Sequence, residues 1–266
     1  MDTAVKSEKI IVRKDGAIGW VIFNNPEKRN AMSLEMYEAT AAAMEGYAKD
    51  SDVRVVILKG AGDKAFISGA DISQFKDRRS NPEQVKAAEA ISVRCSRSIR
   101  ECPKPVIAMI RGYCMGGGLG IAVACDLRIA SDDSRFGIPA AKLGVGYRFA
   151  GVRRLAQLVG PSFTAEIFYT GRQFNSQEAL QMGLVNRVLP AGELEKYVLD
   201  YAATLAANAP LTIAAVKRSL IELGKGPGER DLALCQKMVE DCFASEDYKE
   251  GQAAFMEKRK PVFRGR

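Results

Sequence analysis

Histidine is absent from all 266 residues of the chain. Without it, no Ser-His-Asp or Cys-His catalytic arrangement can form, and most zinc and iron sites lose a common ligand. The commonest general base at neutral pH is missing as well, which excludes a serine protease that relies on histidine. Any acid or base in this protein is therefore an aspartate, glutamate, tyrosine, lysine or cysteine.

Closely spaced cysteine pairs are also missing. None of the six cysteines belongs to a Cys-x-x-Cys motif, and several fall inside apolar helical patterns. The spacing fits neither a structural zinc site nor a disulfide framework, and a chain of this length needs no crosslinks to fold. We predict buried thiols and no metal site.

Long apolar runs and low-complexity stretches are missing too. No run approaches the length of a membrane span, and residues 1–13 are too polar and too acidic for a secretion signal. The 24 glycines and 10 prolines are spread along the chain, and 47% of the residues are hydrophobic. We expect one main ordered domain in a cytoplasmic protein that does not bind membranes.

The chain does have an excess of positive charge. Its formal net charge is +7 and its pI is about 9.1, which suits a polyanion such as a nucleic acid or a small ligand with several phosphates. The charge alone does not choose between them. The basic runs are short, and acidic residues lie between them, as on an ordinary solvated surface.

Hydrophobic periodicity predicts an α/β fold. Strand, strand and helix follow one another repeatedly up to residue 191, and only helices are predicted after it. We therefore divide the chain into a spiral core, residues 1–191, and a helical C-terminal segment, residues 192–266. The expected strands are 10–12, 18–23, 53–58, 65–68, 106–110, 127–130, 135–136 and 184–188; the expected helices are 33–49, 82–102, 151–159 and those of 192–260, broken at Pro210, Gly224–Gly228 and Ser245.

Two glycine-containing junctions, residues 66–71 and 112–118, follow buried strands and are predicted to open helices. The first backbone N–H groups of a helix have no partner within it, and glycine lets another oxygen approach them closely. Two junctions that face each other would supply two donors to one developing oxyanion. Close helix packing is the other explanation for the triple glycine at 116–118.

These junctions, together with the stretches 124–130 and 253–261, resemble the crotonase, or enoyl-CoA hydratase/isomerase, family. The resemblance runs nearly from end to end. It implies an acyl-CoA substrate, a spiral of ββα turns and a helical C-terminal trimerisation segment. The assembly it implies is a homotrimer or a hexamer made of two trimers. No cofactor beyond the coenzyme A moiety of the substrate is implied.

The resemblance also assigns residues. The backbone N–H groups of Ala70 and Gly117 match the family's oxyanion hole, and Asp126 matches a structural position. The positions matched to coenzyme A contacts are Lys28, Arg29, Ser68, and, from a neighbouring subunit, Lys260 or Phe263. For these charged residues, an ordinary solvated surface is the alternative.

The chain departs from the hydratase pattern where that pattern carries its chemistry. Gly120 and Ala140 stand in place of the two catalytic glutamates. Adding water to an enoyl thioester requires a base for the water and an acid for the α-carbon, and neither residue can act as one. The usual isomerase also needs a carboxylate at the second position. The dehalogenase branch needs a nucleophilic aspartate in the loop that here reads Tyr147-Arg148.

The decarboxylase branch fits better. Residues 143–147 and 245–251 resemble methylmalonyl-CoA decarboxylase, which has a tyrosine in the place of Tyr147, although its histidine matches Ala70 here. Decarboxylation needs an oriented carboxylate and a stabilised enolate, and a nearby glutamate would repel that carboxylate. The hypothesis is an acyl-CoA lyase in which Tyr147 orients the carboxylate or relays a proton and Arg148 attracts the anion. A packed aromatic and a surface charge are the alternatives.

Other functions stay open. A hydratase-like lyase or isomerase would use another acid or base, such as Ser68, Asp71 or Tyr113. A catalytically silent acyl-CoA-binding subunit would keep the pocket without the chemistry. One crotonase relative binds RNA through a lysine-rich first helix. The helix expected at 33–49 instead carries three glutamates and one lysine, so we predict no nucleic-acid partner.

Overall fold

The computed structural model describes residues 7–71 and 82–266 and contains two mixed β-sheets. The larger sheet has the order β1-β2-β3-β5-β7-β10. Its first two strands form the predicted antiparallel hairpin, and the remaining neighbours are parallel. The strands are β1 (Ile10–Asp15), β2 (Ile18–Phe23), β3 (Val55–Gly60), β5 (Val106–Ile110), β7 (Leu127–Ser131) and β10 (Arg187–Leu189).

The smaller sheet has the order β4-β6-β8-β9, in which only β9 runs antiparallel to its neighbour. After the first hairpin and its helix, three successive turns place one strand in the larger sheet (β3, β5, β7) and the next in the smaller one (β4, β6, β8), and a helix follows each pair. This arrangement confirms the predicted α/β spiral. The strands are β4 (Ala65–Ile67), β6 (Tyr113–Met115), β8 (Arg135–Gly137) and β9 (Phe174–Asn175).

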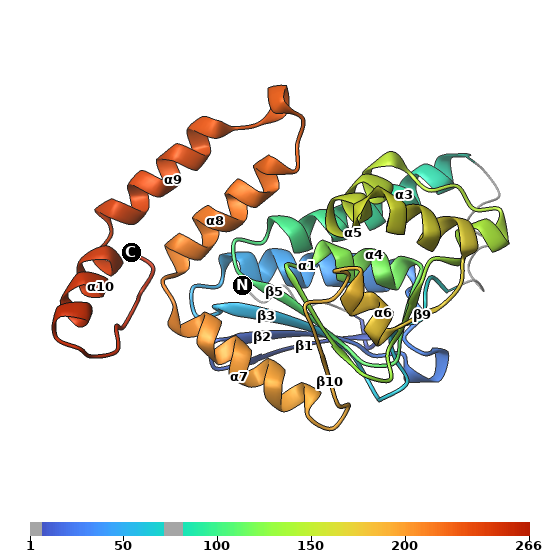
Figure 1. The fold of residues 1–266 in the computed structure, drawn as a ribbon, viewed down its shortest axis with the longest axis horizontal. Helices are drawn as coiled ribbons and strands as arrows, with labels where there is room; N and C mark the ends of the chain where they lie inside the picture. The colour runs from blue at the N-terminus through green and yellow to red at the C-terminus, as the bar shows by residue number, and fades with distance from the viewer. Residues whose placement is uncertain (1–6, 72–81) are drawn as a thin grey trace.

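Helices cover both faces of the larger sheet (Figure 1). α1 (Leu34–Lys49), α3 (Pro82–Glu101) and α4 (Gly117–Ala124) lie on one side and enclose the main core with the smaller sheet. α7 (Leu194–Ala207) packs on the opposite face through its apolar side chains, in a second core cluster that includes Trp20. The elements near the site are therefore held by buried apolar surface on both sides of the sheet.

Several element boundaries differ from the prediction, and β6, β9 and α6 (Ser176–Gln181) were not predicted. The helix expected to end at residue 159 continues as α5 (Phe149–Thr170), with a kink at Gly160, where φ is 80°. Pro161 suits the first turn of the second half, because its missing N–H is not needed there. The strand expected from residue 184 begins only at Arg187, since Gly183 turns the chain with φ 75°. The remaining short elements are η1 (Pro26–Lys28), η3 (Pro139–Leu143) and η4 (Pro227–Glu229).

The last three helices, α8 (Pro210–Leu223), α9 (Leu232–Ala244) and α10 (Glu246–Met256), break at the predicted positions. α9 and α10 lie apart from the two sheets (Figure 1). The tail after α10 returns, and the carbonyl of Phe263 accepts a hydrogen bond from Arg54 Nη2 at 2.9 Å. Among the helices of the described residues, none is long and apolar enough to cross a bilayer.

Candidate functional site

The two glycine-containing junctions lie against each other. Gly69 has φ 128° and Gly116 has φ 51°, backbone conformations that favour glycine. A β-carbon on Gly116 would lie 3.9 Å from the Cα atom of Gly69, so the two turns are in van der Waals contact. The N–H of Gly116 donates to the carbonyl of Gly137 at 2.8 Å and fixes the start of α4.

The backbone nitrogen of Ala70 lies beside Gly117, 3.9 Å from the place where a β-carbon of Gly117 would be. Met32 holds both neighbours of Ala70: its N–H donates to Gly69 and its carbonyl accepts from Asp71, each at 2.9 Å. The N–H of Ala70 itself has no backbone partner in residues 7–71 and 82–266. Gly117 is the first residue of α4, so its N–H has no partner within the helix. Two such donors can stabilise a negative charge on one oxygen.

The last two glycines of the triplet have different roles. A β-carbon on Gly118 would lie 2.6 Å from the Cβ atom of Ile67, so this glycine permits close packing of α4 on β4. A β-carbon on Gly117 would lie 3.9 Å from the backbone nitrogen of Ala70 and 2.6 Å from the hydroxyl of Tyr37. Close packing thus explains Gly118, whereas Gly117 borders the polar space of the site.

Tyr37 is a polar group that the sequence analysis did not assign to the site. It lies on α1, where its spacing fits the buried apolar face, and its hydroxyl ends beside Gly117. The hydroxyl makes no hydrogen bond within the described part of the chain. Burial, with smaller contributions from Cys95 and Tyr147, raises the pKa of Tyr37 well above its usual value. The phenol therefore stays protonated and can act as a hydrogen-bond donor.

A cavity of about 580 Å³ adjoins the two N–H donors. Side chains from α1 and α3 form two of its walls, and the loop 144–148 forms another. Tyr37, Ala70, Glu89 and Tyr147 are among the residues that line it. The cavity therefore combines apolar walls with two phenols and with the carboxylates of Asp71 and Glu89.

Tyr147 lies in this cavity with its ring packed edge-on against Phe168, at a centroid distance of 4.8 Å. The residue is 40% exposed, so its surroundings are part protein and part solvent. Burial raises the pKa of the Tyr147 phenol. Tyr147 is thus a packed aromatic that also lines the cavity, and its role in orienting a carboxylate or relaying a proton stays a prediction.

Arg148 does not offer a free charge, because it forms an ion pair with Glu89. Its side chain is 70% exposed, whereas that of Glu89 is 25% exposed. Glu89 lies on α3, 59 residues before its partner, and sequence spacing gave no signal of their proximity. A substrate anion at Arg148 would have to share the guanidinium with Glu89.

The positions of the two replaced glutamates differ in their surroundings. Gly120 is exposed, and no atom lies within 4 Å of the place where its β-carbon would be. Ala140 is 7% exposed, lies in η3 and packs in the main core. Neither position supplies a carboxylate to the cavity.

The three predicted coenzyme A contacts before Ala70 lie together. Lys28 pairs with Asp71 at 3.0 Å, and the guanidinium of Arg29 lies 5.3 Å from the ring centroid of Tyr113. The hydroxyl of Ser68 donates to the carbonyl of Lys28 at 3.3 Å. These contacts join Ser68 and Lys28 beside Ala70, whereas the Arg29 side chain lies over Tyr113.

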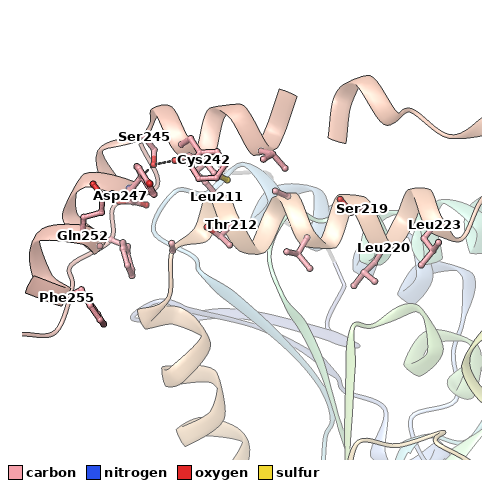
Figure 2. Close-up of a pocket in the computed structure, with 18 residues that line it drawn as sticks. Leu211, Thr212, Ser219, Leu220, Leu223, Cys242, Ser245, Asp247, Gln252 and Phe255 are labelled. Atoms are coloured by element: carbon pink, nitrogen blue, oxygen red, sulfur yellow. Dashed lines mark hydrogen bonds between the residues drawn. The ribbon is translucent and has the colours of Figure 1, made fainter. Parts of the chain in front are cut away.

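The two predicted contacts in the tail, Lys260 and Phe263, line neither Ala70 nor its cavity within one chain. Phe263 instead lines a largely apolar pocket of about 960 Å³ formed chiefly by α8, α9 and α10. Figure 2 shows Leu220 and Leu223 of α8 along this pocket and Phe255 of α10 at its other end. Asp126 is structural as expected: its Oδ2 accepts from the N–H of Val106 and from Lys217 Nζ, both at 2.7 Å.

Comparisons with known proteins agree with this geometry. Residues 13–266 match the family model described as enoyl-CoA hydratase/isomerase. The chain is 34% identical to the short-chain-enoyl-CoA hydratase of Clostridium acetobutylicum, over 94% of this chain and 95% of that protein. It is also 34% identical to the crotonyl-CoA hydratase of Syntrophomonas wolfei, with 96% and 98% covered.

Solved structures agree as well. An enoyl-CoA hydratase/carnithine racemase from Magnetospirillum magneticum superposes with a TM-score of 0.90 at 37% identity, covering 98% of this chain and 97% of that one. An enoyl-CoA hydratase from Bacillus anthracis gives 0.86 at 32% identity, with 97% and 100% covered. The end-to-end match in sequence and fold leads to one conclusion. The chain belongs to the enoyl-CoA hydratase/isomerase, or crotonase, family.

Proposed function

We propose that this protein binds an acyl-CoA thioester, stabilises its enolate, and decarboxylates a malonyl-type acyl group. One observation supports the proposal: Ala70, whose N–H has no backbone partner among the described residues, lies beside Gly117 at the start of α4, while Gly120 and Ala140 stand in place of the two glutamates of a hydratase. Such a site can hold negative charge on the thioester oxygen. It lacks the two glutamates of the hydratase pattern, and the carboxylates that do line the cavity, Asp71 and Glu89, are each paired with a cation.

The proposed reaction has two steps. The bond between the α-carbon and the substrate carboxylate breaks, carbon dioxide leaves, and the electron pair moves onto the thioester as an enolate. The N–H groups of Ala70 and Gly117 receive its oxygen, and the Tyr37 hydroxyl, beside Gly117, is a third donor. Tyr147 then delivers a proton to the α-carbon and regains one from solvent.

Binding of the substrate uses the residues at the edge of the site. We assign coenzyme A to Lys28, Arg29 and Ser68, which lie together before Ala70. Lys260 and Phe263 join them from a neighbouring subunit, and no cofactor is needed beyond coenzyme A. The helical segment 192–266 forms the trimer or hexamer; its support is the set of exposed apolar side chains on α8, α9 and α10.

A second candidate function rests on Glu89. This carboxylate lines the cavity and is only 25% exposed, so it is a possible base for hydration or double-bond migration if the pair with Arg148 opens. The relatives named as hydratases favour the same reading. A silent acyl-CoA-binding subunit is the third outcome to distinguish.

A product assay separates these functions. The pure protein is incubated with methylmalonyl-CoA and with crotonyl-CoA, and the thioester products are identified from their masses by mass spectrometry. Three variants accompany it: Tyr147→Phe, Glu89→Gln, and the control Tyr169→Phe, whose residue is 80% exposed on α5. Loss of carbon dioxide, reduced by Tyr147→Phe alone, supports decarboxylation. Gain of water or a shifted double bond, abolished by Glu89→Gln, supports the second function, and binding without turnover supports a silent subunit.

A further inference from the structure

A second cavity, of about 340 Å³, continues from the first one. The two share Ser92, Val93, Tyr147 and Arg148 in their walls. Gly120 lines only the second cavity, with open space where a side chain would be. The shared residues place the two cavities next to each other, and the missing glutamate leaves open space in the second one.

Four arginines line the second cavity; Arg148 is paired with Glu89 and Arg100 with Glu101, two carboxylates that do not line it. Arg97 and Arg100 reach it from α3, and Arg148 and Arg154 from the start of α5. No aspartate or glutamate is among the described residues that line it. Serine hydroxyls and apolar side chains form the rest of the wall.

Two of these arginines have donor groups without a hydrogen-bond partner in the part of the chain that the structure describes. Arg154 makes no hydrogen bond or ion pair with any residue of 7–71 or 82–266. Arg100 donates from Nη2 to Glu101 at 3.0 Å, but its Nε is buried without a partner. Burial, followed by the nearby charge of Arg100, lowers the pKa of Arg154 to about 10. A partly buried cation without an anion costs free energy, which a bound anion would recover.

We propose that this cavity binds a carboxylate at the far end of the acyl chain, distinct from the carboxylate that leaves, so that a coenzyme A monothioester of a dicarboxylic acid binds in preference to a monocarboxylic acyl-CoA. The inference rests on the proposed placement of the thioester at Ala70 and Gly117. Guanidinium groups suit a carboxylate because they offer paired, planar donors. Arg154 is the principal contact, Arg100 supports it, and Gly120 keeps the space open.

The test compares dissociation constants measured by calorimetry. Adipoyl-CoA and hexanoyl-CoA have the same chain length and differ at the far end, and methylmalonyl-CoA carries its carboxylate on the α-carbon. We expect the wild type to bind adipoyl-CoA about tenfold more tightly than hexanoyl-CoA. Arg154→Gln abolishes this preference. The control Arg94→Gln, which removes a charge on α3 outside both cavities, keeps it.

A second variant keeps the test independent of folding at Arg154. Gly120→Leu fills the open space at an exposed position. It therefore weakens the binding of adipoyl-CoA and leaves the binding of acetyl-CoA unchanged. Equal binding of adipoyl-CoA and hexanoyl-CoA by the wild type overturns the inference and leaves the proposed function intact. If Arg154→Gln weakens the binding of adipoyl-CoA and hexanoyl-CoA equally, the arginines bind coenzyme A phosphates and the inference is overturned. A preference for methylmalonyl-CoA that depends on Arg154 overturns it as well. Failure to bind any thioester overturns the proposed function and the inference together.

Discussion

At the scale of single residues, Tyr37 and Gly117 constrain each other. A β-carbon at position 117 would lie 2.6 Å from the Tyr37 hydroxyl but 4.0 Å from the ring carbon that bears it. Removing the hydroxyl therefore leaves room for that β-carbon. The two positions are expected to behave as one unit and not as independent sites.

Gly117→Ala should destabilise the protein by about 1–3 kcal/mol, the range for overpacking a filled space. In the double variant Gly117→Ala with Tyr37→Phe, most of this loss should be recovered. Urea denaturation of the wild type, both single variants and the double variant measures the coupling. Strictly additive effects would contradict the contact.

Tyr37→Phe should lower kcat with little change in KM, because the hydroxyl is proposed to contact the charge that develops in the enolate. Loss of one such donor typically costs about 100-fold or more. Since burial raises the pKa of Tyr37 above its ordinary value, the donor stays protonated as pH rises through 10. Between pH 7 and 10, ionisation of Tyr37 should therefore not lower kcat of the wild type. A fall in kcat at alkaline pH in the wild type, absent from Tyr37→Phe, would show that the phenol ionises and would contradict the prediction.

The residues anticipated from the sequence are those with local signals. Ala70, Gly117 and Gly120 stand in or beside glycine motifs that resemble a family pattern. The role of Tyr37 could not be predicted because its position on the helix matches that of a core residue. Its hydroxyl does not change the spacing of apolar residues from which the core face is read. Glu89 met Arg148 only through the tertiary fold. No periodicity could have revealed that contact.

At the scale of elements, the kink in α5 positions one wall of the cavity. The second half of the helix brings Phe168 against Tyr147, and the change of direction occurs at Gly160, with φ 80° and ψ 164°. The pattern of apolar residues does not predict that a helix resumes after Gly160-Pro161. Glycine followed by proline ordinarily marks an end, whereas here the proline opens a new helical turn.

Gly160→Ala should destabilise the fold by about 1–3 kcal/mol, because its backbone conformation is unfavourable for alanine. No atom lies within 4 Å of the added methyl group, so a clash cannot account for the loss. The matched control is Gly46→Ala in α1, which also has open space around it and should stabilise by about 1 kcal/mol. Thermal unfolding of both variants decides; equal shifts would refute a backbone cause.

At the scale of the whole molecule, the C-terminal helices present apolar surface that the single chain does not cover. Leu220, Leu223 and Phe243 are each more than 60% exposed, and Phe255 is 83% exposed. The spiral core shows how the chain covers such surface elsewhere, by packing helices on both faces of the larger sheet. The fold of the core was predictable because it repeats one pattern of strands and helices. No element among the described residues covers the exposed apolar side chains of α8, α9 and α10.

The combined variant Leu220→Glu with Phe243→Glu should shift the protein from a trimer or hexamer to a monomer. Like charges placed in an apolar interface repel one another and lose hydration on association. Light scattering after size-exclusion chromatography gives the mass directly. Lys196→Glu on α7, a residue whose side chain is 83% exposed, serves as the control for altered charge. A wild type that is already monomeric would refute the proposed assembly.

The open space at Gly120 also bears on how this chain could diverge. A β-carbon at position 120 would have no atom within 4 Å, whereas Ala140 is buried in the core. On the proposed mechanism, glutamate at position 120 would restore one of the two hydratase carboxylates. It would also enter the cavity proposed to bind a distal carboxylate and offer Arg154 an internal anion. If both proposals hold, one substitution at this position changes the reaction type and the substrate range together.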